Sequence, residues 1–330
     1  MLDLEIKGKT RKRRTLCQYF TECQNIQNYM ISMLDVKSQQ RVLEPCAGQG
    51  AFVMALQRLT FFEQLQIEAV DIDSKALDVL SEWIQKLNIA NVNIRVADTF
   101  FDKTLDDVAL TGGIYDRIIG NPPYGAWQDF GRRAHLKAKY GGYIKETYTL
   151  FIRRCLTLLK NDGVLSFVIP DTFLSLNRHR DLRKLLLNQT SIIEIVRFPS
   201  KMFPGLHFGY SQLCVLTFRK QKPVAKTQFK LIQLKSAWSE LPEARHNSVF
   251  IKQNDCLKDE AMSIFSVANR GMVTKNSLYL GDVAKIVTGF YSGSNRDFIK
   301  PINLDIKGSS RFSPIQAHHI YRKKVDRLLI

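Results

Sequence analysis

The chain of 330 residues has few cysteines, no long apolar run and a shortage of acidic side chains. No stretch approaches the roughly 18 consecutive apolar residues that span a bilayer, and the N-terminus is charged where a signal peptide is apolar. A membrane or secreted protein is therefore not expected. The six cysteines form no CxxC pair, so no metal knuckle is indicated. A chain this long can bury its core without disulfides, and we expect reduced thiols in a cytoplasmic protein.

The shortage of acidic residues leaves a large positive charge. Lys and Arg number 48 against 31 Asp and Glu, which gives a formal net charge of +17 and an isoelectric point near 9.6. Such a balance favours a polyanionic partner, and nucleic acid is the leading one. Residues 1–14 form a basic N-terminal arm, which is either a solvated tail or a phosphate contact.

Short apolar runs alternate with amphipathic segments through most of the chain. Ile26, Met30, Met33 and Leu34 lie at helical spacing and predict an amphipathic helix. The strands and helices expected after it are 41–45, 51–59, 67–73, 74–87 and 92–98. This alternation predicts an α/β doubly wound domain over residues 15–220, whose mostly parallel sheet binds ligands at the carboxyl ends of its strands. Residues 221–270 are polar with weak periodicity and are expected to be a linker region. Turn signals and short β-prone runs predict a β-rich second region over 271–330.

The segment VLEPCAGQGAF, residues 42–52, follows the first expected strand and opens a helix. Gly48 and Gly50 would let the backbone turn tightly and approach a ligand, as in nucleotide-binding βα turns. The segment matches neither the GxGxxG dinucleotide pattern nor a Walker loop. Hydride transfer and ATP hydrolysis are therefore disfavoured.

Acidic side chains follow the next two expected strands, at the edge where a ligand should bind. Asp71 in AVDID is placed to hydrogen-bond ribose hydroxyls, whereas Asp73 is placed to cap the following helix. Asp98 in VADTFF lies at the corresponding edge, with Phe100 and Phe101 able to wall an aromatic ring.

The most specific signal is DRIIGNPPYG, residues 116–125. Two prolines after an apolar strand fix a rigid, extended turn, because each proline locks φ and restrains the residue before it. A primary amino group placed between the Asn121 side-chain oxygen and the Pro122 carbonyl would meet two acceptors. Tyr124 lies just beyond and could stack on a planar ring.

The order of these motifs resembles the gamma class of N6-adenine DNA methyltransferases of restriction-modification systems, over essentially the whole chain. The resemblance implies a Rossmann-like methyltransferase sheet, S-adenosylmethionine as cofactor, and a target-recognition region over 271–330. A glutamate follows Thr21 where such enzymes usually have proline. The cofactor residues that the resemblance implies are Thr21, Glu44, Ala47, Gly48 and Gly50 near the methionine moiety, Asp71 on the ribose, and Asp98 and Phe100 on the adenine.

The resemblance also implies that a target adenine is flipped out of double-stranded DNA. Asn121 and the Pro122 carbonyl would accept its amino hydrogens, and Tyr124 would stack on one face of the base. Phe203 would supply the second wall, with Phe208 as the alternative. Catalysis would then rest on positioning and electrostatics without a strong base.

The segment between the NPPYG turn and the next helix is basic, aromatic and bracketed by glycines. It is expected to be a loop that either contacts phosphates around the extruded base or stays solvated. Its basic and tyrosine residues include Arg132, Arg133, Lys137, Lys139, Tyr140 and Tyr143.

Three other functions stay open from the sequence. A protein glutamine methyltransferase uses a similar turn but would carry its extra domain before the cofactor motifs. An RNA adenine methyltransferase would share the core residues, whereas the segment at 280–299 favours DNA. A catalytically dead nucleic-acid-binding subunit is disfavoured by the intact glycine, aspartate and asparagine positions.

The recognition region that the resemblance implies would continue past Ile330. We therefore expect a fragment or a split enzyme. In a split enzyme, a second polypeptide would supply the rest of the recognition region. Any cognate endonuclease activity would also lie on another polypeptide.

Overall fold

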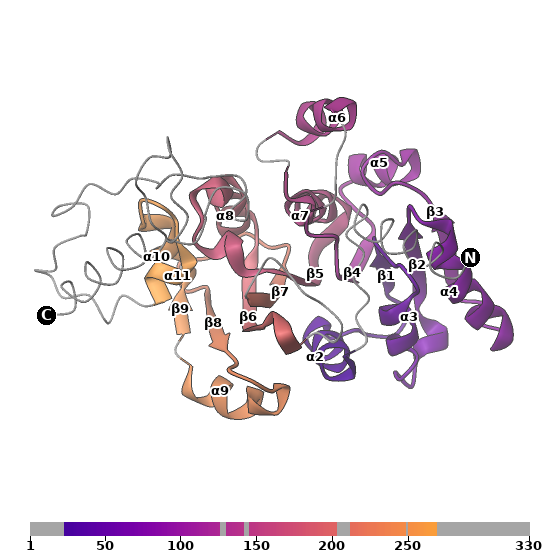
Figure 1. Ribbon diagram of the computed structural model, residues 1–330, viewed down its shortest axis with the longest axis horizontal. Coiled ribbons are helices and arrows are strands. Elements are labelled where there is room, and N and C mark those ends of the chain that lie inside the picture. Colours follow the sequence, from indigo (N-terminus) through magenta and orange to yellow (C-terminus); the bar gives the residue numbers. More distant parts are fainter. Residues whose placement is uncertain (1–22, 126–129, 142–144, 203–211, 249, 269–330) are drawn as a thin grey trace, which may run out of the picture. The chain divides into compact units, whose positions relative to one another are not determined.

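The computed structural model describes residues 23–125, 130–141, 145–202, 212–248 and 250–268 (Figure 1). Several predicted features lie outside these residues, namely the arm at 1–14, Thr21, Tyr143, Phe203, Phe208 and the recognition region at 271–330. In the described part, none of the helices has the length and apolar character needed to cross a membrane.

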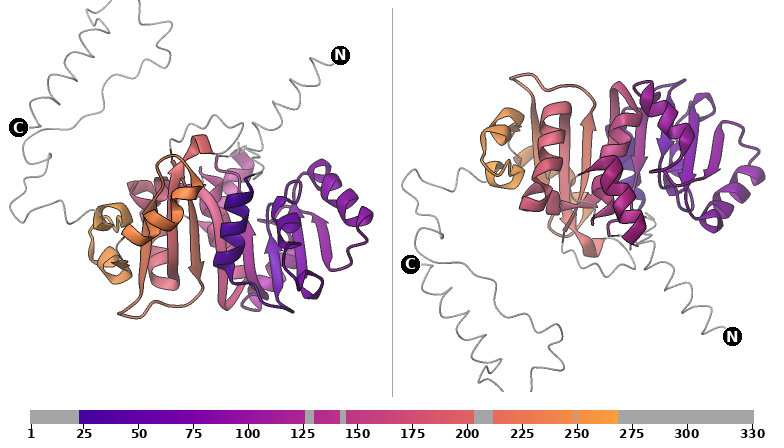
Figure 2. Two further views of the ribbon diagram at one scale, coloured as in Figure 1. Left: turned by 90° about the horizontal axis from the view of Figure 1, so that it is seen from below. Right: turned by 90° about the horizontal axis from the view of Figure 1, so that it is seen from above.

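A sheet of nine strands forms the centre of the described fold, in the order β3-β2-β1-β4-β5-β7-β6-β8-β9. Figure 2 shows these strands as one continuous layer. The strands are β1 (Arg41–Glu44), β2 (Gln66–Asp71), β3 (Val92–Val96), β4 (Tyr115–Gly120), β5 (Leu159–Pro170), β6 (Ser191–Pro199), β7 (Gln212–Arg219), β8 (Gln228–Gln233) and β9 (Phe250–Lys252).

The strands from β3 to β5 pair in parallel, and β7 runs antiparallel between β5 and β6. Strand β8 is parallel to β6, and β9 is antiparallel to β8. The predicted α/β doubly wound sheet is confirmed. Its one internal reversal at β7 was not predicted, because an apolar run buried on both faces has the same pattern in either direction.

Helices cover both faces of the sheet. Figure 1 shows α2 and α3 below the strands and α5, α7 and α8 above them. The described helices are α2 (Gln24–Leu34), α3 (Ala51–Leu56), α4 (Ser74–Lys86), α5 (Lys103–Leu110), α6 (Phe130–Tyr140), α7 (Thr147–Leu158), α8 (Arg180–Gln189), α9 (Leu241–Asn247), α10 (Gln253–Lys258) and α11 (Ile264–Ala268).

Helix α2 illustrates how the sequence pattern becomes packing. Its apolar residues Ile26, Met30 and Leu34 recur at intervals of four and are fully buried. Residues at this spacing share one face of a helix, and burying each such side chain stabilises the fold by roughly 1.5–3 kcal/mol. The helix packs on β4, β5 and β7, in the middle of the sheet.

Residues 221–270, expected to be a linker region, instead extend the sheet. Strand β8 pairs with β6. Helix α9 also contacts β6, because its Arg245 forms an ion pair of 2.6 Å with Glu194 of that strand. The hydroxyl of Tyr29 in α2 also donates to Glu194, at 2.7 Å. The sequence pattern is weak here because β8 and β9 have only six and three residues and lie at the edge of the sheet.

Candidate active site

The carboxyl edge of the sheet gathers the predicted motifs. Strands β3, β2, β1 and β4 are neighbours in that order and run parallel. Asp98, Asp71, the glycine loop and Asn121 follow the ends of these four strands. Segments more than 70 residues apart in the chain therefore lie along one edge, where parallel sheets bind their ligands.

The glycine loop between β1 and α3 is tight and closely bound to β2. The backbone N–H of Ala47 donates to Val70 at 2.9 Å, and that of Gly48 donates to the carboxylate of Asp71 at 2.8 Å. Gly48 and Gly50 have φ values of 54° and 80°, which favour glycine. A Cβ on Gly50 would lie 2.4 Å from the Leu80 side chain, so this position also needs glycine for space.

Glu44 lies beneath this loop and acts on helix α3. Its carboxylate is buried and accepts a hydrogen bond of 3.2 Å from the backbone N–H of Val53, in the first turn of the helix. Burial raises the pKa of Glu44 well above its ordinary value. The contact joins the end of β1 to the helix that follows the glycine loop.

Asp71 joins the first loop to the second. One carboxylate oxygen accepts from Gly48, and the other accepts from the backbone N–H of Asp73 at 2.8 Å. The residue is 8% exposed, and burial raises its pKa. Each carboxylate oxygen has a second lone pair, so these two hydrogen bonds leave acceptor capacity for a ligand hydroxyl. Asp73 caps α4 by accepting from Lys75, as its position predicted.

Asp98 and Phe100 have different environments. One oxygen of Asp98 accepts from the Phe100 backbone N–H at 3.1 Å, and the other pairs with Arg132. The Phe100 ring is 2% exposed and packs on Phe151 and Tyr140, with ring centroids 4.6 Å and 5.8 Å away. The ring therefore belongs to the core of the described structure, and its predicted contact with a ligand adenine stays a prediction.

Two exposed apolar side chains lie at the same edge and were not singled out from the sequence. Ile72 directly follows Asp71 and is 51% exposed, and Val96, which pairs with Asp71 in the register of β2 and β3, is 60% exposed. The sequence signal for Ile72 was its position in AVDID, where it is an apolar residue between two aspartates at the end of an expected strand. Both apolar residues lie at the carboxyl edge of the sheet that also carries Asp71 and Asp98.

The NPPY turn follows β4 beside the glycine loop. The Tyr124 hydroxyl donates to the side-chain oxygen of Asn121 at 2.7 Å, and Tyr124 is 1% exposed. The backbone N–H of Thr147, the first residue of α7, donates to the Tyr124 carbonyl at 3.0 Å. Gly120 precedes the turn, and a Cβ there would lie 3.2 Å from Phe167 and 3.3 Å from Cys46. The turn is thus closely packed at both ends.

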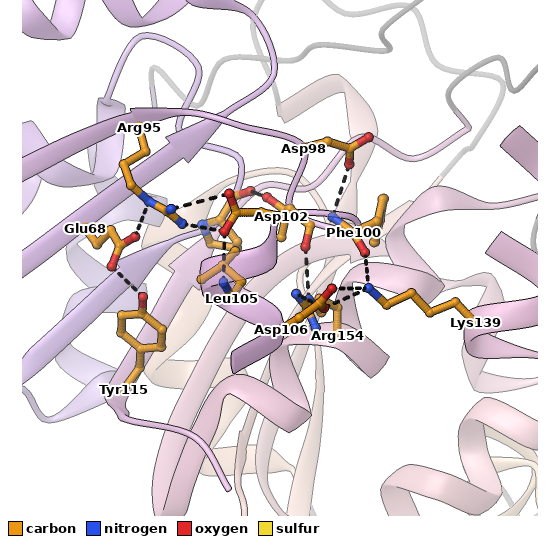
Figure 3. Close-up of polar contacts among 12 residues, drawn as sticks. Glu68, Arg95, Asp98, Phe100, Asp102, Leu105, Asp106, Tyr115, Lys139 and Arg154 are labelled. Atoms are coloured by element: carbon orange, nitrogen blue, oxygen red, sulfur yellow. Dashed lines mark hydrogen bonds and ion pairs between the residues drawn. The ribbon is translucent and has the colours of Figure 1, made fainter. Parts of the chain in front are cut away.

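The basic segment expected to be a loop after the turn contains helix α6. Leu136 is fully buried, and residues with good helix propensity surround it. Lys139 contacts the Phe100 carbonyl at 2.8 Å and the Asp106 carboxylate at 2.7 and 2.8 Å (Figure 3). The hydroxyl of Tyr140 also donates to the Phe100 carbonyl, at 2.9 Å. These contacts place the helix against the loop that follows β3.

Two charged groups hold that loop from opposite sides, as Figure 3 shows. On one side Arg95 bridges Glu68 at 2.6 Å and Asp102 at 2.9 Å. On the other side the nearly buried Arg154 of α7 donates to the Thr99 carbonyl at 2.9 Å and pairs with Asp106 at 2.7 Å. These residues carry no recognisable motif, so sequence reasoning did not find them.

The solved structures that resemble this fold include methyltransferases. The type I restriction-modification system methyltransferase subunit from Streptococcus thermophilus aligns with a TM-score of 0.58 at 14% identity, over 76% of this chain and 59% of that chain. A Listeria monocytogenes protein assigned to the class I S-adenosylmethionine-dependent methyltransferases aligns with a TM-score of 0.54 at 17% identity, over 67% of each chain. The fold is therefore that of a class I S-adenosylmethionine-dependent methyltransferase.

The sequence comparisons define the family more narrowly. The family model described as Eco57I restriction-modification methylase matches residues 11–203, and the chain belongs to this family. The type II methyltransferase M.HincII of Haemophilus influenzae is 29% identical over 234 residues, which are 68% of this chain and 41% of that protein. M.AccI of Acinetobacter calcoaceticus is 24% identical over 307 residues, which are 87% of this chain and 53% of that protein. The chain thus spans about half the length of these curated relatives, or less.

Proposed function

We propose that this chain transfers a methyl group from S-adenosylmethionine to the N6 amino group of a flipped adenine in double-stranded DNA, as part of a restriction-modification or phage-defence system. One observation carries the proposal. The glycine loop after β1 and the NPPY turn after β4 follow adjacent parallel strands, paired at Val42–Arg117 and Leu43–Ile118. Adjacent strands lie about 4.8 Å apart, so a donor at the loop and an acceptor at the turn are neighbours.

The residues at this edge fit S-adenosylmethionine. A tight loop without side chains at 48 and 50, carboxylates at 71 and 98, and exposed Ile72 provide the contacts that a nucleoside with a charged tail needs. We assign Glu44, Ala47, Gly48 and Gly50 to the methionine moiety, Asp71 to the ribose, and Asp98 to the adenine, with Thr21 and Phe100 as further predicted contacts. When bound, the cofactor supplies a methyl group activated by a sulfonium.

The NPPY turn recognises the group to be methylated. The Asn121 side-chain oxygen and the Pro122 carbonyl accept the two amino hydrogens and so orient the nitrogen lone pair toward the glycine loop. Tyr124 stacks on one face of the base, and Phe203 is the predicted second wall. The turn needs no strong base for this task, because preorganised acceptors stabilise the charge that develops on the amino group.

The proposal is supported by the family and by the charge of the chain. The Eco57I family is described as a family of restriction-modification methylases, and M.HincII and M.AccI are named type II methyltransferases. A net charge of +17 suits a polyanionic substrate. These relatives also disfavour the alternative of a protein glutamine methyltransferase, in which the extra domain would precede the cofactor motifs. RNA remains the second candidate substrate, because its adenine carries the same amino group.

The test is transfer of a labelled methyl group from S-adenosylmethionine to duplex DNA, to RNA and to a release-factor protein, with the modified product identified. Asn121→Ala should abolish transfer. Asn188→Ala changes an exposed asparagine whose amide donates to the Lys184 carbonyl within helix α8, and it should leave transfer unchanged. N6-methyladenine in DNA that disappears in Asn121→Ala supports the proposal. Label found only in RNA or only in protein would replace it with the corresponding alternative.

A further inference from the structure

Arg132 of helix α6 is paired with Asp98, the carboxylate that the proposed function assigns to the adenine of the cofactor. Arg132 forms an ion pair with Asp98, and the two side chains are 27% and 21% exposed. The Arg132 guanidinium also lies over the Phe101 ring, 5.3 Å from its centroid. Charge-assisted pairs of this kind are stronger than hydrogen bonds between neutral groups, and partial burial reduces their screening by salt.

The same helix is anchored two turns further along. Lys139, seven residues after Arg132, contacts the Phe100 carbonyl and Asp106, and it lies 5.6 Å from the centroid of the same Phe101 ring. Residues seven apart share one face of a helix, about 10 Å from each other along the axis. One face of α6 is therefore fastened across the loop 98–102 by Arg132 at one end and by Lys139 and Tyr140 at the other.

We propose that Arg132 competes with the adenine amino group of the cofactor for Asp98. This inference rests on the proposed function, in which Asp98 accepts from that amino group. One oxygen of Asp98 accepts from the Phe100 backbone N–H and the other is held by Arg132, so each oxygen keeps one lone pair for a ligand. The charge-assisted contact with Arg132 draws negative charge from the carboxylate and so weakens it as an acceptor. Asp98 therefore binds the amino group at full strength only when Arg132 moves away from this oxygen. Part of the binding free energy of the cofactor is therefore spent on releasing Arg132.

The proposal sets Arg132 apart from the other cations of α6. Lys139 contacts a backbone carbonyl and the Asp106 carboxylate of helix α5, so it holds the loop in place without occupying Asp98. Lys137 is exposed on the same helix and provides a control with the same change in charge. Arg132 should therefore be the residue of this helix whose removal strengthens cofactor binding.

The experiment is titration calorimetry of the full chain with S-adenosylmethionine. Arg132→Gln should lower the Kd about two- to fivefold, the range expected from losing a partly exposed ion pair, whereas Lys137→Gln should leave it unchanged. Asp98→Asn should raise the Kd. Adding Arg132→Gln to Asp98→Asn should then have no further effect, because the two residues act on one contact.

A second ligand isolates the amino group. S-inosylhomocysteine has an oxygen in place of that group and can accept from a guanidinium, so Arg132→Gln should not improve its binding, whereas S-adenosylhomocysteine should bind more tightly to the variant. Unchanged or weaker S-adenosylmethionine binding by Arg132→Gln, with Asp98→Asn still weakened, overturns the competition alone. Unchanged binding by Asp98→Asn overturns both the competition and the assignment of Asp98 to the adenine.

Discussion

The hydroxyl of Tyr124 donates a hydrogen bond of 2.7 Å to the side-chain oxygen of Asn121. The residue assigned to stack on the target base therefore holds the residue assigned to accept the amino hydrogens of that base. Because Tyr124 is 1% exposed, its ring has no free face in this arrangement. Under the proposed function, stacking on a flipped adenine requires the Tyr124 ring to move, and this movement changes the hydrogen bond that the Asn121 oxygen accepts.

Two substitutions at Tyr124 separate the ring from the hydroxyl. Tyr124→Phe keeps the stacking surface and frees the Asn121 oxygen, so we expect methyl transfer to stay within about fivefold of the unmodified chain, the equivalent of one neutral hydrogen bond. Tyr124→Ala loses the surface and should be about 10- to 100-fold slower, since stacking on a base contributes roughly 1–3 kcal/mol. Single-turnover rates on duplex DNA measure both. Equal losses in the two variants would show that the hydroxyl is essential and would contradict the stacking role.

Gly50 should be essential to the cofactor loop. Gly50→Ala places a Cβ 2.4 Å from Leu80 at a φ of 80°, so we expect lower stability and cofactor binding at least tenfold weaker. Gly112→Ala is the matched control, because Gly112 has a φ of 89° and open space around its Cβ position. It should lose stability through backbone strain and keep its affinity for S-adenosylmethionine. Calorimetric titration and thermal unfolding distinguish the two effects, and equal affinity in both variants would contradict the assignment of this loop.

The ion pairs at the N-terminus of α7 should make stability depend on pH. Burial acts to raise the pKa of Glu146, but the hydrogen bond and charge of His179, at 3.1 Å, and the charge of Arg178, at 2.6 Å, lower it below its ordinary value of 4.5. A lowered carboxylate pKa stabilises the fold above the ordinary value, and this contribution is lost as the pH falls through the lower pKa.

Glu146→Gln should therefore reduce the free energy of unfolding by about 1–2 kcal/mol at pH 7. The difference from the unmodified chain should shrink as the pH is lowered below 4.5, where Glu146 itself becomes protonated. Urea unfolding at several pH values measures this trend, and exposed Glu82→Gln is the control. A difference that is constant with pH would show that Glu146 stabilises the fold through packing and not through its charge.

Arg154 should position the loop after β3. Arg154→Met removes a nearly buried cation that donates to the Thr99 carbonyl and pairs with Asp106. We expect a loss of about 2 kcal/mol in stability and weaker binding of S-adenosylmethionine, because a buried carbonyl and a carboxylate lose their donor. The turnover rate at saturating cofactor should change little. A lower rate with an unchanged cofactor Kd would contradict a role through this loop.

Local sequence determined the elements and the edge at which the site forms. Periodic apolar residues identified α2 and the alternating strands and helices, glycines at 48 and 50 marked the tight turn, and Asp73 marked a helix start. Each of these signals acts within a few residues, through backbone conformation or side-chain spacing. Because parallel strands bring their carboxyl ends together, the position of Asn121 near the glycine loop also followed from the pattern.

The tertiary structure alone decided which distant groups meet. The antiparallel direction of β7, the addition of β8 and β9 to the sheet, and the burial of Phe100 depend on partners that the chain brings from far away. The same holds for the pairing of Asp98 with Arg132 and of Glu194 with Arg245, which lie 34 and 51 residues apart. Ion pairs and hydrogen bonds at such separations leave no periodic trace in a sequence, because their geometry exists only once the sheet and its helices have packed.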